Sequence, residues 1–403
     1  MSKKRIYLDW NATAPPLESA LEAMLAAARD AWGNPASVHA HGRAARASVE
    51  AAREAVAKLA GADPRDVVLT SGGTEANNLA LRSLSRGSRG PDPARRVDEA
   101  GRPLDLPVLL TSRLEHPSVA RVAEALEREG AARVRWLRVA GDGRLDLADL
   151  ERALEEEPRP ALLALQSVNA ETGVVQPVAE AAALARARGA RVHVDAVQEW
   201  GKLELRYEAD TRSLAAHKFR GPKGIGALVA RPGLHLSPVL VGGSQERGLR
   251  PGTVDPVGAA GLAAAARHAM EAPARWARLA PLRDRLEAAL LAMHPGAEVN
   301  GGPAPRAPHV TSLGMPGWSG PELVAALDLE GVSCSAGSAC SAGSFEPPGA
   351  VAAAWGEGRA ASTVRLSMGE TTTEADVEAA IEAFRTVLAR GGAGFARGHA
   401  GKA

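Results

Sequence analysis

The feature of this sequence that most limits its possible folds is a regular alternation of two kinds of segment. Short runs of β-branched or leucine residues are followed by longer Ala-, Arg- and Glu-rich stretches with helical spacing. The predicted strands are residues 67–69, 108–110, 134–139, 161–165 and 192–194, and the predicted helices are a segment from Thr74 and residues 118–129, 145–155 and 178–188. Strands that alternate with helices of this length predict βαβ units and a mostly parallel sheet covered on both faces.

The alternation ends near Pro256, where a long Ala-rich helical segment begins. This segment, residues 259–293, is interrupted at Pro273 and Pro281 and is followed by a further predicted helix at 321–330. We therefore predict two domains and a tail. Their bounds are 12–258 for a large domain, 259–392 together with 1–11 for a smaller α/β domain, and 393–403 for a flexible tail. Residues 85–107, rich in Gly, Arg, Pro and Asp, are predicted to form a solvated insertion.

Charge and composition exclude several classes of protein. The 48 Lys and Arg residues nearly balance the 47 Asp and Glu residues, so electrostatics does not favour nucleic acid or an anionic membrane as a partner. The apolar runs are too short or too charged to span a bilayer. Two cysteines, Cys334 and Cys340, cannot form a disulfide framework, and residues 1–9 leave no room for a signal-peptide core. We expect a cytoplasmic protein with no nucleic-acid or membrane partner and no metal.

One motif follows a predicted strand and opens a helix. In residues 70–75 (TSGGTE), two glycines allow close approach of the backbone, and the helix start supplies N–H groups that have no partner within the helix. Gly73 and Thr74 are therefore candidates for binding a phosphate. A capped helix start without a ligand is the alternative.

Two further candidates lie later in the chain. Asp195 ends a predicted strand, at the edge of the sheet where open α/β folds bind ligands, and its carboxylate could pair with a protonated ring nitrogen. We expect His193 and Asp195 to point to opposite faces and so not to share a metal. Lys218 lies between His217 and a Gly-Pro turn, in an apolar stretch that favours a neutral, nucleophilic amine.

A run of small residues, 333–344 (SCSAGSACSAGS), is predicted to form a mobile loop with Cys340 at its centre. An exposed thiol in such a loop is available for reaction. A buried structural cysteine is the alternative, and it suits Cys334, next to a predicted strand, better than Cys340.

In their order along the chain these motifs resemble the cysteine desulfurases. The shared segments are residues 7–13, 33–35, the 70–75 turn, Glu115-His116, residues 195–198, His217-Lys218, and residues 248–253, 338–340 and 365–367. The cysteine loop is similar to that of the subgroup serving iron–sulfur assembly. The resemblance implies class V aminotransferases of the pyridoxal phosphate (PLP)-dependent fold type I. It implies a large PLP-binding domain with a mostly parallel seven-stranded sheet and a smaller α/β C-terminal domain carrying the catalytic cysteine loop.

The resemblance also implies a role for each matching residue. Lys218 would bind PLP covalently, Asp195 would keep the pyridine nitrogen protonated, and His116 would stack on the ring and assist proton transfers. The other PLP contacts would be Gly73, Thr74 and His217 at the phosphate, Thr253 of the partner subunit, and Asn169 and Gln198 at the phenolic oxygen. Asn34 and Arg365 would bind the carboxylate of substrate L-cysteine.

The implied reaction converts L-cysteine to L-alanine. Lys218 would remove the α-proton, and the Cys340 thiolate would attack the substrate sulfur to form a protein persulfide. The sulfur would pass to an acceptor protein, a scaffold or carrier for iron–sulfur clusters or thiolation. A second subunit is needed because Thr253 would complete the neighbouring site, so the resemblance implies a homodimer.

Two positions depart from the pattern of this family. Ala215 stands where relatives usually place a serine hydroxyl on the phosphate, so PLP is expected to bind more weakly by about 1 kcal/mol. Ala170 stands where many relatives have a second asparagine. The alternatives are a selenocysteine lyase, another class V PLP-dependent lyase or aminotransferase, and a catalytically silent dimeric accessory subunit. The joint presence of Lys218, Asp195, His116 and Cys340 argues against a silent protein.

Overall fold

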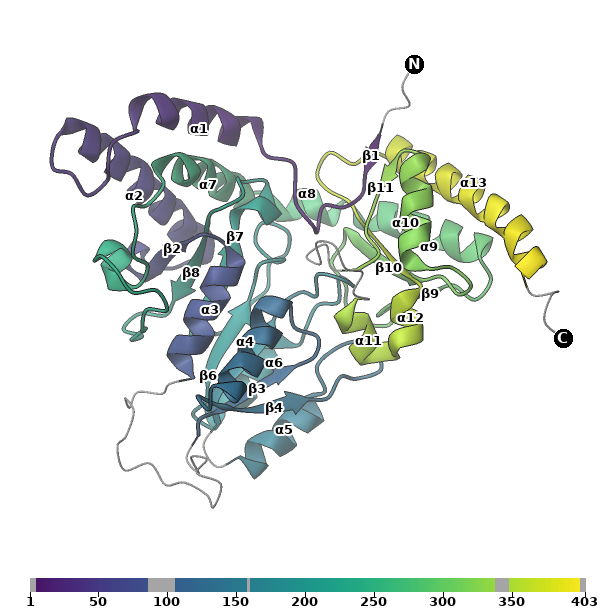
Figure 1. The fold of residues 1–403 in the computed structure, drawn as a ribbon, viewed down its shortest axis with the longest axis horizontal. Helices are drawn as coiled ribbons and strands as arrows, with labels where there is room; N and C mark the ends of the chain where they lie inside the picture. Colours follow the sequence, from purple (N-terminus) through teal and green to yellow (C-terminus); the bar gives the residue numbers. More distant parts are fainter. Residues whose placement is uncertain (1–4, 86–105, 158–159, 338–347, 399–403) are drawn as a thin grey trace.

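A larger and a smaller unit lie side by side in a computed structural model of the protein (Figure 1). The structure describes residues 5–85, 106–157, 160–337 and 348–398, with side chains as far as residue 390. Most of the predicted insertion, 86–105, and the centre of the predicted cysteine loop therefore lie outside the described residues. None of the described helices combines the length and the apolar character needed to cross a membrane.

The larger unit is built on a sheet to which the described residues contribute seven strands. In spatial order these are β2 (Val67–Thr70), β8 (Gly226–Ala230), β7 (Thr211–Ala215), β6 (Arg191–Asp195), β5 (Pro160–Gln166), β3 (Val108–Ser112) and β4 (Arg133–Leu137). β8 is antiparallel to both of its neighbours, and the other neighbouring pairs are parallel. The predicted mostly parallel seven-stranded sheet is confirmed, and the carboxyl ends of the parallel strands meet at one edge.

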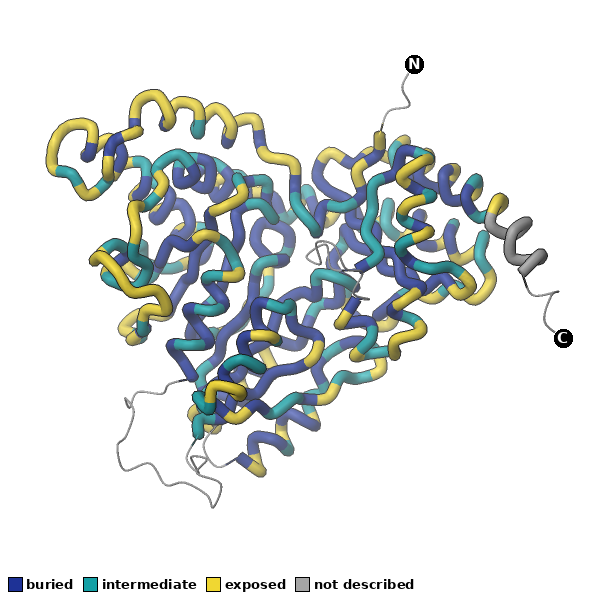
Figure 2. The backbone as a smooth tube through the Cα atoms, viewed as in Figure 1, coloured by how far each residue is buried: buried dark blue, intermediate teal, exposed yellow. Residues whose placement is uncertain are grey.

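Alternate residues of each strand pack on opposite faces of this sheet. In β3, Val108 and Leu110 belong to one apolar core, whereas Leu109 belongs to another. The first core lies beneath α2 (Ala40–Ala60), α5 (Leu147–Glu156), α6 (Val178–Ala187) and α7 (Pro256–Ala269), and the second beneath α3 (Gly73–Leu84) and α4 (Pro117–Arg128). The strands are accordingly buried and the outer helices partly exposed (Figure 2). Helix α1 (Glu18–Asp30) lies against α7.

The smaller unit has its own sheets and core. Its strands are the parallel pair β1 (Ile6–Tyr7) and β11 (Val332–Ser333), and the antiparallel β12 (Thr363–Ser367), β10 (Val310–Gly314) and β9 (Glu298–Val299). Its helices are α8 (Pro273–Ala277), α9 (Ala280–Met293), α10 (Gly320–Leu329), α11 (Gly349–Trp355), α12 (Glu357–Ala361) and α13 (Glu374–Gly398). Trp10, Trp276 and Phe384 are among the large side chains of this core. Short 3-10 turns are η1 (Pro64–Asp66), η2 (Ala216–Phe219) and η3 (Gln245–Gly248).

Two features differ from the sequence-based expectations. The pattern missed β7 and β8, whose sequences TRSLA and GALVA contain few β-branched residues. Helix α13 continues to Gly398, so residues 393–398 of the predicted tail form the end of this helix. Extending an existing helix needs no new nucleation step, which is why a segment without apolar periodicity can continue it. The domain boundary at 258 stays a prediction, and the packing of α7 in the core of the larger unit favours a boundary beyond that helix.

Glu370, which follows β12, joins the two units through hydrogen bonds to two arginines and a histidine. Its carboxylate accepts hydrogen bonds from Arg220 Nη1 at 2.9 Å, from His268 Nε2 at 2.8 Å and from Arg275 Nε at 3.2 Å. Arg220 lies two residues beyond Lys218, His268 belongs to α7 and Arg275 to α8. The Glu370 side chain is 5% exposed. This carboxylate therefore holds the turn after Lys218 against the smaller unit.

Replacing Glu370 with alanine is expected to lower the free energy of unfolding by about 3 kcal/mol. The loss arises because Arg220, Arg275 and His268 lose a buried hydrogen-bond partner. The expected loss lies at the lower end of the range of about 3–5 kcal/mol for breaking a buried ion pair, because Arg275 is 38% exposed. The matched control is Glu378→Ala, which removes an exposed ion pair with Arg285 and is expected to change stability by less than about 1 kcal/mol. Urea unfolding of the three proteins measures both effects, and equal losses in the two variants would contradict a joining role for Glu370.

Candidate functional site

The turn between β2 and α3 places two glycines, whose backbone carries no side chain, at the carboxyl edge of the large sheet. Gly72, just before α3, has a φ of 149°, which favours glycine. A Cβ atom on Gly73 would lie 2.7 Å from Val197 Cγ2, and one on Gly226 would lie 2.7 Å from Gly72 Cα. Glycine is therefore required at both positions by close packing. The first-turn N–H groups of α3 suit an anion at this edge.

Asp195 ends β6 at the same edge, where three donors hold its carboxylate. Asn77 Nδ2 donates to Oδ2 at 2.8 Å, and the backbone N of Val197 and the Oγ of Ser213 donate to Oδ1 at 3.1 and 3.2 Å. Asp195 is only 6% exposed. Because the donors belong to α3, to β7 and to the turn after β6, the orientation of the carboxylate is set by three separate elements.

The structure corrects the expectation that His193 and Asp195 point to opposite faces of the sheet. Residues two apart on a strand share a face, and Asn77 on α3 contacts both of them. His193 Nε2 lies 3.0 Å from Asn77 Oδ1, and His193 Nδ1 lies 2.9 Å from Thr211 Oγ1. In the part of the chain that the structure describes, no group of three His, Cys, Asp or Glu side chains could hold a metal ion.

The buried ring of His193 makes stability depend on pH. Burial lowers the pKa of His193 to about 4, although the charge of Asp195 acts in the opposite direction. The unfolded chain, with a pKa near 6.5, binds the extra proton, so the contribution of neutral His193 is present above pH 6.5 and is lost as the pH falls toward 4. We expect wild type to exceed His193→Asn in free energy of unfolding by about 1 kcal/mol less at pH 5.5 than at pH 7. Urea unfolding at both pH values tests this, and a difference independent of pH would contradict it.

Lys218 and His217 lie in η2, directly after β7. Lys218 Nζ donates to the backbone oxygens of Asn11 and Ala12 at 2.7 and 2.8 Å. His217 Nδ1 lies 3.1 Å from Thr13 Oγ1. Burial is the largest cause that lowers the pKa of His217, to about 3, so its ring is neutral at neutral pH. The turn therefore presents an amine and a neutral imidazole together, both held by residues 11–13.

His116 is linked to Asp195 by a chain of hydrogen bonds that the sequence did not reveal. His116 Nδ1 accepts from the backbone N of Ser118 at 3.1 Å, which caps α4, and lies 2.8 Å from Ser118 Oγ. Asn77 Nδ2 donates both to Ser118 Oγ and to Asp195 Oδ2, each at 2.8 Å. The adjacent Glu115 is buried, and burial together with the charge of Asp195 raises its pKa well above the ordinary range. The only feature of the sequence that could have indicated the role of Asn77 is the presence of a polar amide among the apolar residues of α3.

The two predicted amide side chains have different surroundings. Gln198 Nε2 donates to the backbone oxygen of Asn11 at 3.0 Å, the same oxygen that accepts from Lys218 Nζ. Asn169 Nδ2 donates to the backbone oxygen of Leu114 at 3.1 Å, and its Oδ1 accepts from backbone N–H groups of the following turn. Gln198 is therefore adjacent to the Lys218 amine, and Asn169 joins the end of β5 to the segment before His116.

Arg365 belongs to β12 and is almost completely buried. Its Nη2 lies 2.6 Å from Asp9 Oδ1, and its Nη1 donates to the backbone oxygen of Ala170 at 3.0 Å. Its Nε has no hydrogen-bond partner among the described residues. A buried donor without a partner is unfavourable, so this guanidinium retains capacity for a carboxylate. Ala170 lies next to Asn169, which places Arg365 beside the large sheet.

Two predicted residues are exposed in a single copy, and a third lies outside the described residues. Asn34 is exposed in the loop between α1 and α2, where its Oδ1 accepts from the backbone N of Ala36 at 2.9 Å. This loop and the smaller unit with β10 lie at opposite ends of the molecule in Figure 1, so a single copy does not bring Asn34 to Arg365. Thr253 is exposed in the segment before α7. Cys340 lies outside the described residues.

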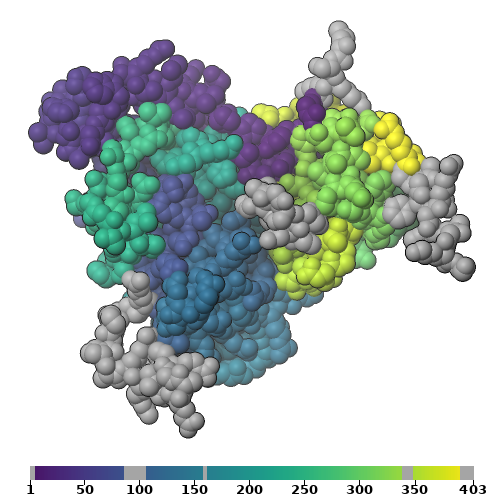
Figure 3. Space-filling view, viewed as in Figure 1, coloured from purple at the N-terminus to yellow at the C-terminus, as the bar shows by residue number. Residues whose placement is uncertain are grey.

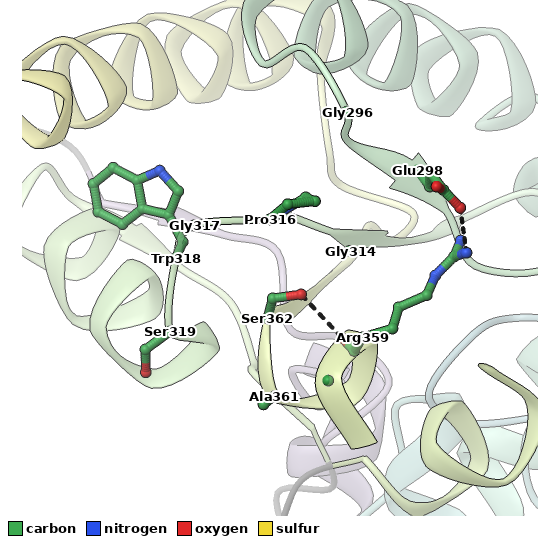
Figure 4. Close-up of a pocket in the computed structure, with 11 residues that line it drawn as sticks. Gly296, Glu298, Gly314, Pro316, Gly317, Trp318, Ser319, Arg359, Ala361 and Ser362 are labelled. Carbon is green, nitrogen blue, oxygen red and sulfur yellow. Dashed lines mark hydrogen bonds and ion pairs between the residues drawn. The ribbon is translucent and has the colours of Figure 1, made fainter. Parts of the chain in front are cut away.

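A pocket of about 650 Å³ lies in the smaller unit, between the end of β10, the start of α10 and α12 (Figure 4). It is lined by Gly296, Glu298, Gly314, Pro316, Gly317, Trp318, Ser319, Gly358, Arg359, Ala361 and Ser362. An ion pair between Glu298 and Arg359 closes one side of it. None of the predicted site residues lines this pocket.

Nearly the whole chain is similar to known proteins of one family. Residues 6–380 match the model of the family described as aminotransferase class-V. A cysteine desulfurase of Cereibacter sphaeroides is 40% identical over 390 residues, covering 96% of each chain, and an IscS-like cysteine desulfurase of Mycobacterium tuberculosis is 38% identical, covering 95% of this chain and 96% of that protein. A solved NifS-like protein superposes with a TM-score of 0.83 at 29% identity, covering 96% of this chain and all of that one. A structure described as SspA in complex with cysteine has a TM-score of 0.76 at 28% identity, covering 91% of this chain and 100% of that one.

Proposed function

The chain belongs to the aminotransferase class-V family and is a cysteine desulfurase, and we propose that it removes sulfur from L-cysteine at the carboxyl edge of its large sheet. The products are L-alanine and a persulfide on Cys340. The persulfide sulfur passes to an acceptor protein, a scaffold or carrier for iron–sulfur clusters or thiolation. A cytoplasmic location stays a prediction from the cysteine content.

One observation carries the assignment of the site. The Lys218 amine and the Gln198 amide share the carbonyl oxygen of Asn11, and Gln198 follows Asp195 by three residues at the end of β6. The next strand, β7, supplies Ser213 to Asp195 and leads directly into Lys218. An amine and a carboxylate are therefore held at one edge of a rigid sheet, next to the glycine turn before α3.

The residues at this edge fit PLP. Asp195 Oδ2 accepts only one hydrogen bond from the described residues, so it can accept another from a protonated ring nitrogen. Gly73, Thr74 and neutral His217 would hold the phosphate, Asn169 and Gln198 the phenolic oxygen, and Lys218 the aldehyde carbon. Bound PLP supplies an electron-withdrawing ring that makes removal of the α-proton and cleavage of the carbon–sulfur bond accessible.

The side chains of this protein supply the remaining functions. Arg365 binds the carboxylate of the substrate, and its ion pair with Asp9 fixes the direction of the guanidinium. Lys218 Nζ takes the α-proton and returns a proton to the product. His116 is held at its Nδ1 side by Ser118, which fixes the plane of a ring that assists proton transfer. Cys340, as a thiolate, takes the sulfur atom while the substrate β-carbon gains a proton.

A direct assay tests this function. Purified protein with PLP is incubated with L-cysteine, alanine is quantified, and the Cys340 peptide is examined by mass spectrometry for one added sulfur atom. Both products are expected. Alanine formed only from selenocysteine would indicate a selenocysteine lyase, and turnover of another amine without alanine would indicate a different class V enzyme.

We also propose a homodimer, with Thr253 of the partner subunit at each phosphate. Three large apolar side chains, Trp32, Val38 and Val241, are 64%, 83% and 97% exposed in a single copy. Apolar surface of this kind favours association. Asn34 and Thr253 are both exposed in a single copy, so both are accessible to a second copy. The larger unit, with these N-terminal helices, is seen in surface view in Figure 3. Sedimentation of a monomer at micromolar concentration would contradict this part of the proposal.

A further inference from the structure

Lys202 is a buried lysine to which neither the motifs nor the proposed reaction assigns a role. It follows β6 after a short turn and is 1% exposed. Its Nζ lies 5.3 Å from the centre of the Trp276 ring, which belongs to the core of the smaller unit. Lysine is almost never fully buried unless it is paired. Within the described ranges, however, Lys202 forms no ion pair with a carboxylate.

A continuous chain of hydrogen bonds leads from Lys202 to Lys218. Lys202 Nζ donates to Gln198 Oε1 at 2.7 Å, and Gln198 Nε2 donates to the backbone oxygen of Asn11 at 3.0 Å. The same Asn11 oxygen accepts from Lys218 Nζ at 2.7 Å. A carbonyl oxygen has two lone pairs, so these two donors occupy it fully. The two lysines therefore interact through one amide and one carbonyl group.

The direction of each bond in this chain follows from the groups at its ends. The Asn11 oxygen can only accept, so the nitrogen of the Gln198 amide must face it and the oxygen must face Lys202. Gln198 is 5% exposed, which leaves little access for a water that could replace the Lys202 donor. Without Lys202, the Gln198 oxygen would be buried without a partner, an arrangement that side chains avoid by rotating.

The charges around Lys202 suit a neutral donor. Burial first, then the positive charges of Lys218 and Arg365, lower the pKa of Lys202 well below its ordinary value. An uncharged amine can still donate to Gln198. It does so without placing a second cation beside Lys218, whose amine must be neutral to act as a nucleophile. His309 is buried, and its Nε2 lies 2.9 Å from Asn11 Oδ1. Burial is the largest cause that lowers the pKa of His309 well below its ordinary value, so this ring is also neutral.

We propose that Lys202 is a positioning residue that orients the Gln198 amide, so that Gln198 Nε2 and Lys218 Nζ share the Asn11 carbonyl. The inference rests on the proposed function, in which Gln198 and Lys218 both contact PLP. Sharing weakens the hydrogen bond that the carbonyl accepts from protonated Lys218, and thereby favours the neutral amine. When Lys202 is removed, Gln198 rotates away, the carbonyl serves Lys218 alone, and the Lys218 amine becomes more basic.

The test uses Lys202→Met, which keeps the length of the side chain and removes its donor. In the full-length protein freed of PLP, the rate at which Lys218 reacts with an acylating reagent is followed by mass spectrometry across the pH range. We expect the midpoint of this profile to rise by about 0.5 pH unit, so that Lys218 reacts about threefold more slowly near neutral pH. The pH midpoint of the visible absorbance of the PLP-loaded protein is expected to move in the same direction. An unchanged midpoint in the PLP-free protein would overturn the proposal.

Two comparisons separate positioning from a general loss of packing. Leu290→Ala removes a buried side chain of the smaller unit, and it is expected to lower stability without moving the Lys218 midpoint. The double variant Lys202→Met with Gln198→Leu is expected to shift the midpoint no further than Gln198→Leu alone, because Lys202 acts through Gln198. A shift in Leu290→Ala equal to that of Lys202→Met, or additive shifts in the double variant, would overturn the proposal.

A conservative variant covers the case in which Lys202→Met does not fold. Lys202→Gln keeps a nitrogen donor at position 202, so its Lys218 midpoint is expected to shift by less than half as much as in Gln198→Leu. An equal shift in the two variants would exclude a role for the donor at position 202. The proposed function fails separately, if wild-type protein takes up no PLP or forms no alanine. The reactivity of Lys218 in PLP-free protein does not depend on that result.

Discussion

Replacing Lys218 with alanine is expected to abolish alanine formation, with a loss of at least about a thousandfold in turnover. The amine is expected both to hold the cofactor and to move the α-proton, and the described chain brings no second lysine into its place at the end of β7. Lys202 Nζ is buried against Gln198 and Trp276, so it does not substitute for Lys218. The variant is therefore expected to lose the visible absorbance of bound PLP along with its activity. Absorbance spectra and alanine assays of the purified protein measure both.

The matched control is Lys223→Ala, which removes an exposed lysine five residues further along the same turn. It is expected to keep both absorbance and turnover, apart from a small change in the pKa of His217, to which the charge of Lys223 contributes. Full activity in Lys218→Ala would refute the assignment of the reactive amine. Equal losses in both variants would show that the turn, rather than the Lys218 amine, is what the reaction requires.

The two cysteines of the chain are expected to respond in opposite ways to substitution by serine. Cys340→Ser is expected to lose the persulfide completely and to reduce alanine formation at least about a hundredfold, while the absorbance of bound PLP is kept. Cys334→Ser is expected to retain both products. Burial, reinforced by the charge of Asp9, raises the pKa of Cys334 to about 12, so its thiol stays protonated and unreactive at neutral pH.

Both cysteines lie on one tryptic peptide, residues 307–359, so fragmentation of this peptide by mass spectrometry after reaction with L-cysteine distinguishes the two thiols. Added sulfur on Cys334, with none on Cys340, would contradict this assignment. Alanine production unaffected by Cys340→Ser would instead favour the selenocysteine lyase or aminotransferase alternative, since neither requires the loop thiol. Because Cys334 and Cys340 are the two cysteines of the sequence, the pair of variants accounts for every thiol in the chain.

Local patterns predicted the elements that have a local cause. The β2 strand and α3 helix could be predicted because an apolar run, a Gly-Gly turn and a helix start follow one another within a few residues. The same holds for Asp195, whose place at the end of β6 follows from the length of the apolar run before it. β7 and β8 could not be predicted in this way. They form strands because partner strands on both sides satisfy their backbone groups, a stabilisation that their own composition does not indicate.

The supporting residues of the site were missed for a different reason. Asn77, Ser118 and Lys202 are polar side chains in apolar segments, and in the sequence each resembles an ordinary surface residue. The role of Asn77 arises from hydrogen-bond partners 41 and 118 residues away in the sequence. The role of Lys202 depends on its burial against Trp276 of the smaller unit. The error about His193 and Asp195 was one of strand geometry. Side chains two residues apart share a face, and Asn77 bridges both of them.

The strands and helices that have a local pattern, the reactive residue types and the likeness to a family could be predicted from the sequence, because each depends on neighbouring residues or on motif order. Tertiary structure alone decided which groups surround each reactive side chain. It placed three donors on Asp195, gave Lys218 and Gln198 a common acceptor in Asn11, and left Asn34 remote from Arg365 within a single copy. The charge and direction of a buried side chain depend on burial and on partners from distant segments, and the folded chain is what brings those segments together.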